Sequence, residues 1–252
     1  MSTSLKQRLR QHQPTIGTWI KTPSPMVCEV LSRSSLDVVC LDAEHSPFDR
    51  GSLDQCLHAL RAGDMPSLVR VPSTAAEHTL NALDCGATGI VMPHVTSAAA
   101  AESIARAAHF GAGGRGYAGS TRAAGYTTKP MGEHLKDSAS QTAVIAQIED
   151  LEALDAIDDI AAVDAIDCLF IGRIDLTVAL GASSPKDSVV IDAVERICQA
   201  GQSAGRCVGM FVGNPDELPR WRQAGASFFL LSSDHGFLLE GAERLAAKFG
   251  DS

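Results

Sequence analysis

The chain has 252 residues, of which 45% are hydrophobic and 20% are charged, and its formal net charge is −9. A negative surface repels phosphate backbones, so we expect no nucleic-acid partner. No stretch approaches the roughly 20 apolar residues of a membrane span, and the N-terminus has no apolar segment typical of a secretion signal. The seven cysteines form no CxxC pair. They are typical of buried thiols in a reducing compartment, so we expect a cytoplasmic protein with no membrane partner.

Eight short apolar runs alternate along the chain with stretches of helix length. Such continuous apolar runs are typical of strands that are covered on both faces. The predicted strands are Ile16–Ile20, Val38–Asp42, Ser67–Val71, Gly89–Met92, Val144–Glu149, Cys168–Ile171, Val208–Val212 and Phe228–Leu231. The predicted helices are Pro25–Ser34, Leu53–Ala62, Ala75–Asp84, Ser97–Ala108, Leu151–Ile160, Val189–Ala204, Pro215–Ala224 and Phe237–Phe249.

Eight strand–helix units in this order predict one closed (β/α)₈ barrel, an α/β fold that spans residues 1–252 as a single domain. An open doubly wound sheet is the alternative, but no GxGxxG motif opens the first helix, so we expect no nucleotide cofactor. One connection, about residues 109–141 after the fourth strand, is long and rich in Gly, Arg, Ser and Thr. Long connections of this kind in compact barrels are often functional.

Polar side chains gather where several predicted strands end, which is the catalytic face of barrel enzymes. Glu149 and Asp175 follow neighbouring strands, and two such carboxylates repel each other unless a cation lies between them. Hard divalent cations prefer carboxylate oxygens, and Mg²⁺, Mn²⁺ and Co²⁺ all fit this donor set. The alternative is that both acids are solvated residues that cap the helices after them.

Two further side chains at this face are candidates for catalysis. His45 follows Asp42 and Glu44, which could orient its ring and tune its pKa, as could Asp84; the alternative is an ordinary surface histidine. Arg70 ends an apolar strand, and a guanidinium in a barrel mouth requires an anionic partner. The free backbone N–H groups after the sixth strand could hold a substrate carboxylate.

The chain resembles the HpcH/HpaI family of class II pyruvate aldolases, of the 4-hydroxy-2-oxoheptanedioate aldolase type. The resemblance covers nearly the whole chain. It rests on the segments GTWIKTPSP, DVVCLDAEHSP, LVRVP, LDCGATGIVMPHV, GGRGYAGSTRAAGY, AQIE and FIGRIDL, in this order.

The resemblance implies a role for each matching residue. Metal binding is implied for Glu149 and Asp175, acid/base catalysis for His45 with Asp84 orienting it, and stabilisation of an enolate oxygen for Arg70. Substrate contacts are implied for Trp19, Gln147, Gly172, Ile174, Asp175 and Phe211, and a supporting place for Asp42, Glu44 and Arg122. The resemblance also implies a homo-oligomer, a trimer or hexamer, in which the C-terminal helix could be exchanged between subunits.

The chain departs from the family at positions expected to contact the substrate. Arg173-Ile174 replaces a common Pro-Ala pair, Phe211 is bulkier than the usual aliphatic residue, and the KTPSP loop differs from several members. The expected reaction is reversible aldol cleavage of a 4-hydroxy-2-oxo acid to pyruvate or hydroxypyruvate and an aldehyde, with possible oxaloacetate decarboxylation. The departures leave the 2-oxo acid and the aldehyde open.

Several other functions remain open. An aldolase that acts on 2-dehydro-3-deoxy sugar acids, or another metal-dependent carbon–carbon lyase, has the same residue requirements. A Schiff-base aldolase needs a lysine inside the barrel, and only Lys21 lies near a strand end, so we expect no Schiff-base lysine. A non-catalytic barrel predicts that Glu149→Gln leaves function intact. A phosphosugar enzyme is disfavoured because no Gly-rich phosphate cradle follows the last two strands.

Overall fold

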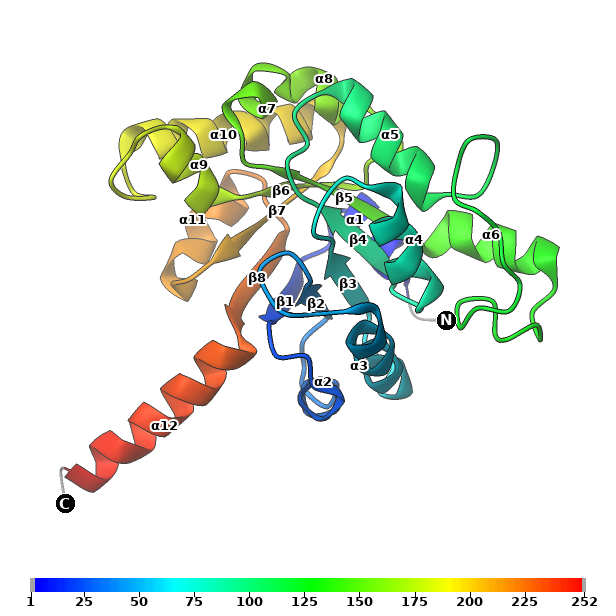
Figure 1. The fold of residues 1–252 in the computed structure, drawn as a ribbon. Coiled ribbons are helices and arrows are strands. Elements are labelled where there is room, and N and C mark those ends of the chain that lie inside the picture. The colour runs from blue at the N-terminus through cyan, green and yellow to red at the C-terminus, as the bar shows by residue number, and fades with distance from the viewer. Residues whose placement is uncertain (1–2, 251–252) are drawn as a thin grey trace.

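The computed structural model describes residues 3–250 and forms a closed ring of eight parallel strands, in chain order, with β8 paired back to β1 (Figure 1). The strands are Thr15–Ile20 (β1), Val38–Asp42 (β2), Ser67–Arg70 (β3), Gly89–Met92 (β4), Ala143–Ile148 (β5), Cys168–Ile171 (β6), Cys207–Val212 (β7) and Phe228–Ser233 (β8). The predicted (β/α)₈ barrel is therefore confirmed: the apolar runs form the strands of a closed ring, and most of their residues are buried.

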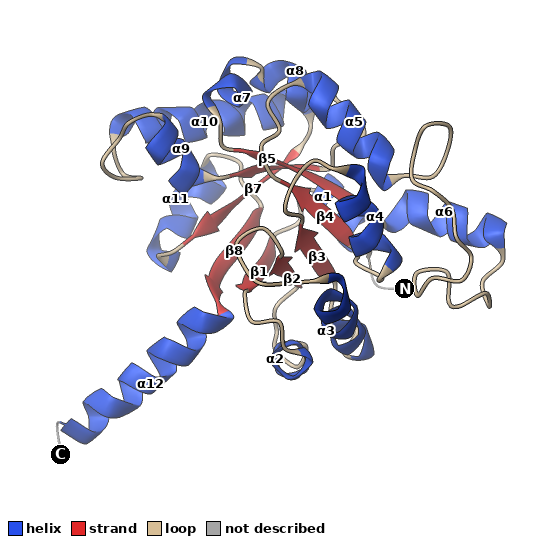
Figure 2. Ribbon diagram, viewed as in Figure 1, coloured by secondary structure: helices blue, strands red, loops and turns tan. Residues whose placement is uncertain are grey.

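Helices surround the strand ring (Figure 2). They are Leu5–Arg10 (α1), Pro25–Leu31 (α2), Arg50–Ala62 (α3), Ala76–Asp84 (α4), Ala98–Ala108 (α5), Met131–Gln141 (α6), Leu151–Asp155 (α7), Ile157–Ala162 (α8), Arg173–Ala179 (α9), Ser188–Ala204 (α10), Leu218–Gln223 (α11) and Asp234–Gly250 (α12), with a 3₁₀ turn at Pro215–Glu217 (η1). The single helix expected over residues 151–160 is instead two, because the backbone leaves helical geometry at Ala156.

Helix α1 closes the end of the barrel at which the strands begin. Its buried Leu5 and Leu9 belong to the same apolar cluster as the side chains that fill the barrel interior. Lys6 donates a hydrogen bond to the Thr142 carbonyl, and Arg10 binds the buried Asp167 at 2.6 Å. The opposite end, where the strands finish, is called the mouth of the barrel below.

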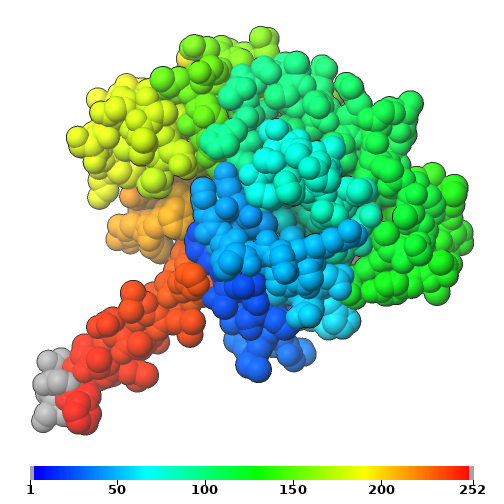
Figure 3. All heavy atoms as spheres, in the orientation of Figure 1, coloured from blue at the N-terminus to red at the C-terminus, as the bar shows by residue number. Residues whose placement is uncertain are grey.

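The C-terminal helix α12 leaves the barrel and stands clear of the rest of the surface (Figures 1 and 3). Several of its apolar side chains are exposed, among them Leu238 at 68% and Leu245 at 69%. Among the described residues, no helix is long and apolar enough to cross a membrane.

Candidate active site

The centre of the barrel mouth holds a buried carboxylate between two cations. Asp42, at the end of β2, is fully buried and accepts hydrogen bonds from Arg70 at 2.8 and 3.0 Å and from Lys21 at 2.6 Å. Register places Asp42 directly opposite Arg70 on β3. Burial on its own would raise the pKa of Asp42, but Arg70, Lys21 and the backbone N–H of His45 outweigh it and leave the pKa lowered.

Glu44 and His45 lie beside this cluster. Glu44 is 3.3 Å from Arg70 Nε, and burial raises the pKa of its carboxyl group despite that cation. The His45 side chain is 61% exposed, and its Nε2 lies 3.8 Å from Glu44. His45 is thus free to reach a molecule in the mouth, and Glu44 is the carboxylate within 4 Å of its ring among the described residues.

Glu149 lies just after β5 and is 97% removed from solvent. One of its oxygens accepts a hydrogen bond from the backbone N–H of His94 at 2.9 Å, and the other accepts one from Gln147 Nε2. Gln147 is 1% exposed, yet its Oε1 has no hydrogen-bond partner among the described residues. An unpaired buried carbonyl is costly, so the Gln147–Glu149 pair presents an unused acceptor in the barrel mouth.

The segment after β6 lies against Glu149. A Cβ at Gly172 would come within 2.6 Å of a Glu149 carboxylate oxygen, so only glycine fits there. Ile174 and Asp175, in the first turn of α9, are exposed. The guanidinium of Arg173 binds Glu217, and the expectation that this position contacts the substrate stays a prediction.

Trp19 and Phe211 border the mouth from β1 and β7. The Trp19 ring lies 4.4 Å from the Arg70 guanidinium carbon and meets Phe170 edge-on. Phe211 is partly buried against the cluster that fills the barrel interior. Trp19 thus stacks on the guanidinium that binds Asp42, which restricts the directions in which Arg70 can point.

Asp84 and Arg122 lie away from this mouth. Asp84 ends α4, and a helix that follows a barrel strand returns to the opposite end of the barrel. Both residues line a cavity of about 520 Å³, where Arg122 binds Asp54 at 2.7 Å. Burial raises the pKa of Asp84, opposed by Arg115 and Arg50. Within one chain, the structure therefore does not bring Asp84 to His45.

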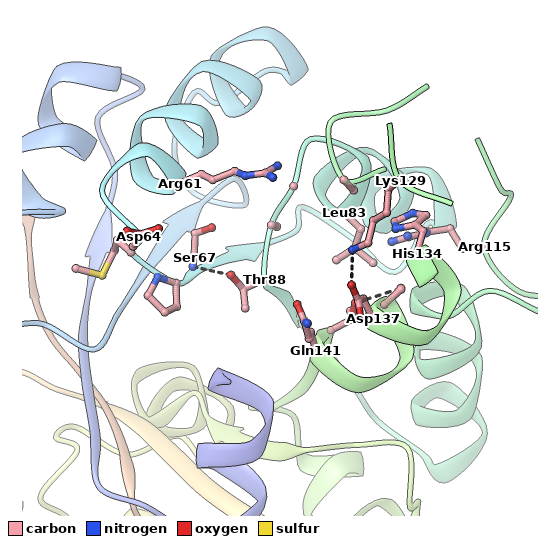
Figure 4. A pocket seen from close by; sticks show the side chains of 17 residues that line it. Arg61, Asp64, Ser67, Leu83, Thr88, Arg115, Lys129, His134, Asp137 and Gln141 are labelled. Carbon is pink, nitrogen blue, oxygen red and sulfur yellow. Dashed lines mark hydrogen bonds and ion pairs between the residues drawn. The ribbon is translucent and has the colours of Figure 1, made fainter. Parts of the chain in front are cut away.

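Another cavity, of about 360 Å³, lies at the same far end, between α3, α4 and α6 (Figure 4). It is lined by residues where β3, β4 and β5 begin, and Lys129 and Asp137 form an ion pair in it. None of the predicted site residues lines this cavity. It is thus separate from the strand ends at which barrel enzymes perform their chemistry.

His94 is the residue at the mouth that sequence reasoning missed. It follows β4, and its Nδ1 lies 3.1 Å from Asp150 and 3.5 Å from Glu149. Burial alone would lower the pKa of His94, but Asp150, Glu149 and Glu44 outweigh it and leave the pKa raised. Its sequence position could have indicated a site residue, because His94 lies two residues after the apolar strand β4, just as Glu44 lies two residues after β2.

Comparison with known proteins identifies relatives of this chain. Residues 15–240 match the model of the HpcH/HpaI aldolase/citrate lyase family. The chain is 34% identical over 243 residues to a hydroxypyruvate/pyruvate aldolase of Paraburkholderia phytofirmans, covering 93% of each protein. It is 29% identical to a 4-hydroxy-2-oxo-heptane-1,7-dioate aldolase of Shigella flexneri, covering 100% of this chain and 95% of that protein.

A crystal structure of a family protein from Burkholderia cenocepacia superimposes with a TM-score of 0.92, at 34% identity and over 100% of both chains. The barrel fold and the sequence similarity together identify the family of this chain. The protein is a carbon–carbon lyase, a class II aldolase, and belongs to the HpcH/HpaI aldolase/citrate lyase family.

Proposed function

We propose that the protein uses a divalent cation to cleave and form 4-hydroxy-2-oxo acids, with pyruvate or hydroxypyruvate as the 2-oxo product and an aldehyde as the other. The observation that carries this proposal is the buried Gln147–Glu149 pair with its unpaired amide oxygen, beside the Asp42–Arg70 cluster. The names of the relatives, hydroxypyruvate/pyruvate aldolase and 4-hydroxy-2-oxo-heptane-1,7-dioate aldolase, support this choice of substrates.

Glu149 and Asp175 would hold the cation, and the residues present fit it. Glu149 is a buried carboxylate that, among the described residues, has no lysine or arginine bound to it, and the missing side chain of Gly172 leaves room beside one of its oxygens. Such oxygen donors suit Mg²⁺, Mn²⁺ and Co²⁺. When bound, the cation would withdraw electron density from the keto group of the 2-oxo acid and so acidify the neighbouring C–H.

The chain's own side chains would perform the remaining steps. Arg70 is held by Asp42 and Trp19 and would stabilise the negative charge that develops on the keto oxygen. His45 would move the proton, because its ring is exposed and free to reach the substrate. Gln147 and the backbone from Gly172 to Asp175 would hold the 2-oxo acid, while Trp19, Ile174 and Phe211 would contact the substrate.

We also propose a homo-oligomer, a trimer or hexamer. The exposed apolar face of α12 would be covered by a neighbouring subunit, in line with the expected exchange of this helix. Association would also allow Asp84 and Arg122 of one subunit to approach His45 of another, which a single chain does not permit. The catalytic site would then be shared between subunits.

Lys21 is the candidate for the rival Schiff-base reaction. Its side-chain nitrogen is held by the buried Asp42 at 2.6 Å, whereas a Schiff-base lysine must have a free amine to attack a carbonyl. An enolate formed at this site would also arise by loss of CO₂ from oxaloacetate, so we expect decarboxylation as a side activity.

The test is metal removal combined with covalent trapping. EDTA should abolish aldol cleavage, added Mn²⁺ or Co²⁺ should restore it, and borohydride should trap no substrate on the protein. Full activity after exhaustive chelation, or a borohydride-stable adduct at Lys21, would overturn the proposal. A panel of aldehydes with pyruvate and with hydroxypyruvate would then identify the substrate pair and separate it from a sugar-acid aldolase.

A further inference from the structure

His94 places an imidazole against two carboxylates at the end of β4. Its Nδ1 lies 3.5 Å from Glu149 Oε1, and 3.3 and 3.1 Å from the two oxygens of Asp150. One donor atom from each of these three residues lies within 4.8 Å of the other two. The His94 side chain is 61% exposed, so its ring borders the open mouth instead of the core.

The backbone fixes this arrangement. Met92 of β4 pairs with Ala146 of β5, so the residues that follow the two strands lie side by side. His94 adopts a positive φ of 54°, which is uncommon for a residue other than glycine. In this conformation its N–H donates to Glu149, while its ring faces the same carboxylate.

An independent feature also indicates a ligand here. Gln147 is 1% exposed, and its amide binds Glu149 through Nε2 while its Oε1 has no hydrogen-bond partner among the residues described. Buried polar atoms are nearly always paired, so an unpaired acceptor beside Glu149 indicates that something else completes the site.

We infer that His94 is a nitrogen ligand of the cation that Glu149 binds, and that Asp150 supplies a further oxygen. This inference rests on the metal dependence proposed above, and Asp175 keeps the role proposed there. Metal–ligand bonds of about 2.1 Å place neighbouring donor atoms about 3.0–3.4 Å apart. The separations of 3.1 and 3.5 Å around His94 Nδ1 are close to that range.

An imidazole ligand has a consequence for the choice of ion. Carboxylate and water ligands suit Mg²⁺, whereas imidazole suits later transition ions, whose affinity rises from Mn²⁺ to Co²⁺. His94 therefore favours Co²⁺ over Mg²⁺ more strongly than an all-oxygen site would. A simple ion pair between His94 and the carboxylates would give the same distances but no such preference.

Electron spin-echo spectroscopy distinguishes a metal-bound His94 from a His94 that only forms an ion pair, and it does so without measuring activity. Protein labelled with [¹⁵N]histidine is stripped of metal and loaded with Mn²⁺. We expect ¹⁵N coupling from a directly bound imidazole in the unsubstituted protein and its loss in His94→Asn, since asparagine tolerates the positive φ. His45→Gln is the matched control: the His45 ring is also 61% exposed at the mouth, and Glu44 is its carboxylate neighbour within the described part of the chain. The ¹⁵N coupling should persist in His45→Gln.

Calorimetry on the same proteins provides a second readout. His94→Asn should weaken Co²⁺ binding about tenfold or more and Mg²⁺ binding distinctly less. If Mn²⁺ binds the unsubstituted protein without ¹⁵N coupling, or if the coupling survives His94→Asn, the inference is overturned while the metal dependence stands. If Mn²⁺ does not bind at all, the proposed metal function fails, and the inference fails with it.

Discussion

Asp42 carries a buried negative charge that Arg70 and Lys21 neutralise from two sides. Asp42→Asn would leave the Arg70 guanidinium buried without its full counter-charge. Removing one partner of a buried ion pair typically costs about 3–5 kcal/mol of unfolding free energy. We expect a loss of that size in urea denaturation. The control is Glu195→Gln, which breaks an exposed pair with Arg220 and should change stability by less than about 1 kcal/mol.

The same substitution predicts a change in acid stability. Because the folded pKa of Asp42 lies below its unfolded value of about 3.9, its charge stabilises the fold above that pH. This contribution is lost as the pH falls through the lowered folded pKa. Stability should therefore fall less steeply below about pH 4 in Asp42→Asn than in the unsubstituted protein. Parallel curves for the two proteins would contradict the assigned pairing.

Arg70 tests the catalytic role of the cluster. Arg70→Lys keeps a positive charge but loses the forked donors that reach Asp42 and a substrate oxygen together. We expect kcat for aldol cleavage to fall about 10²-fold, the size typical of a lost oxyanion donor. Circular dichroism should show that the fold is retained. Unchanged kcat in a folded Arg70→Lys protein would remove Arg70 from the reaction.

Some residues of the candidate site could be predicted from the sequence and others could not. Arg70 was predicted because a guanidinium at the end of an apolar strand has few structural explanations, and Glu149 because it pairs with Asp175 after neighbouring strands and matches a family motif. His94 was not, because its proximity to Glu149 depends on the β4–β5 register and on a positive φ. Neither the register nor the positive φ can be predicted from the local segment Pro-His-Val.

At the scale of elements, the turn from β6 into α9 depends on one missing side chain. A Cβ at Gly172 would approach Glu149 within 2.6 Å, so Gly172→Ala should displace that carboxylate. We expect Mn²⁺ affinity to fall at least tenfold, measured by calorimetry, and the melting temperature to fall as well, because the new Cβ would also lie within 2.7 Å of the Glu149 Cβ. Gly132→Ala on α6 is the matched control: nothing lies within 4 Å of its Cβ position, so metal affinity should stay the same.

The strands were predictable within two residues, because each is a continuous apolar run buried on both faces. Three helices, α1, α6 and α9, are not among the predicted ones. Helix α1 is six residues long with two core leucines, and its stability comes from closing the barrel and binding Asp167. The buried residues of helix α6 are the polar His134 and Ser138. Its sequence therefore lacks the apolar residues at helical spacing that predict a helix.

At the scale of the whole molecule, α12 predicts association. Exposed apolar surface is unfavourable by about 25 cal/mol per Å², and an isolated helix has little stability of its own. Light scattering should therefore give a mass several times the 26.5 kDa of one chain. The double substitution Leu238→Glu and Leu245→Glu should yield smaller species, while Glu240→Gln should not. A monomeric unsubstituted protein would contradict the proposed oligomer.

The proposed role of Asp84 also depends on how the subunits associate. Sequence resemblance gave it a role beside His45, whereas the single chain puts it at the other end of the barrel. Only contacts between chains can bring Asp84 and His45 together. The hydrophobic periodicity and the motifs of one chain do not predict such contacts.

The proposed reaction depends on an enolate of a 2-oxo acid that forms at a metal held by Glu149. The most direct measurement is deuterium exchange at C3 of pyruvate in D₂O, followed by mass spectrometry without any aldehyde. Exchange should occur with the Mn²⁺-loaded protein and stop with EDTA or in Glu149→Gln. No exchange by the metal-loaded protein, or exchange that is unchanged in Glu149→Gln, would contradict the account.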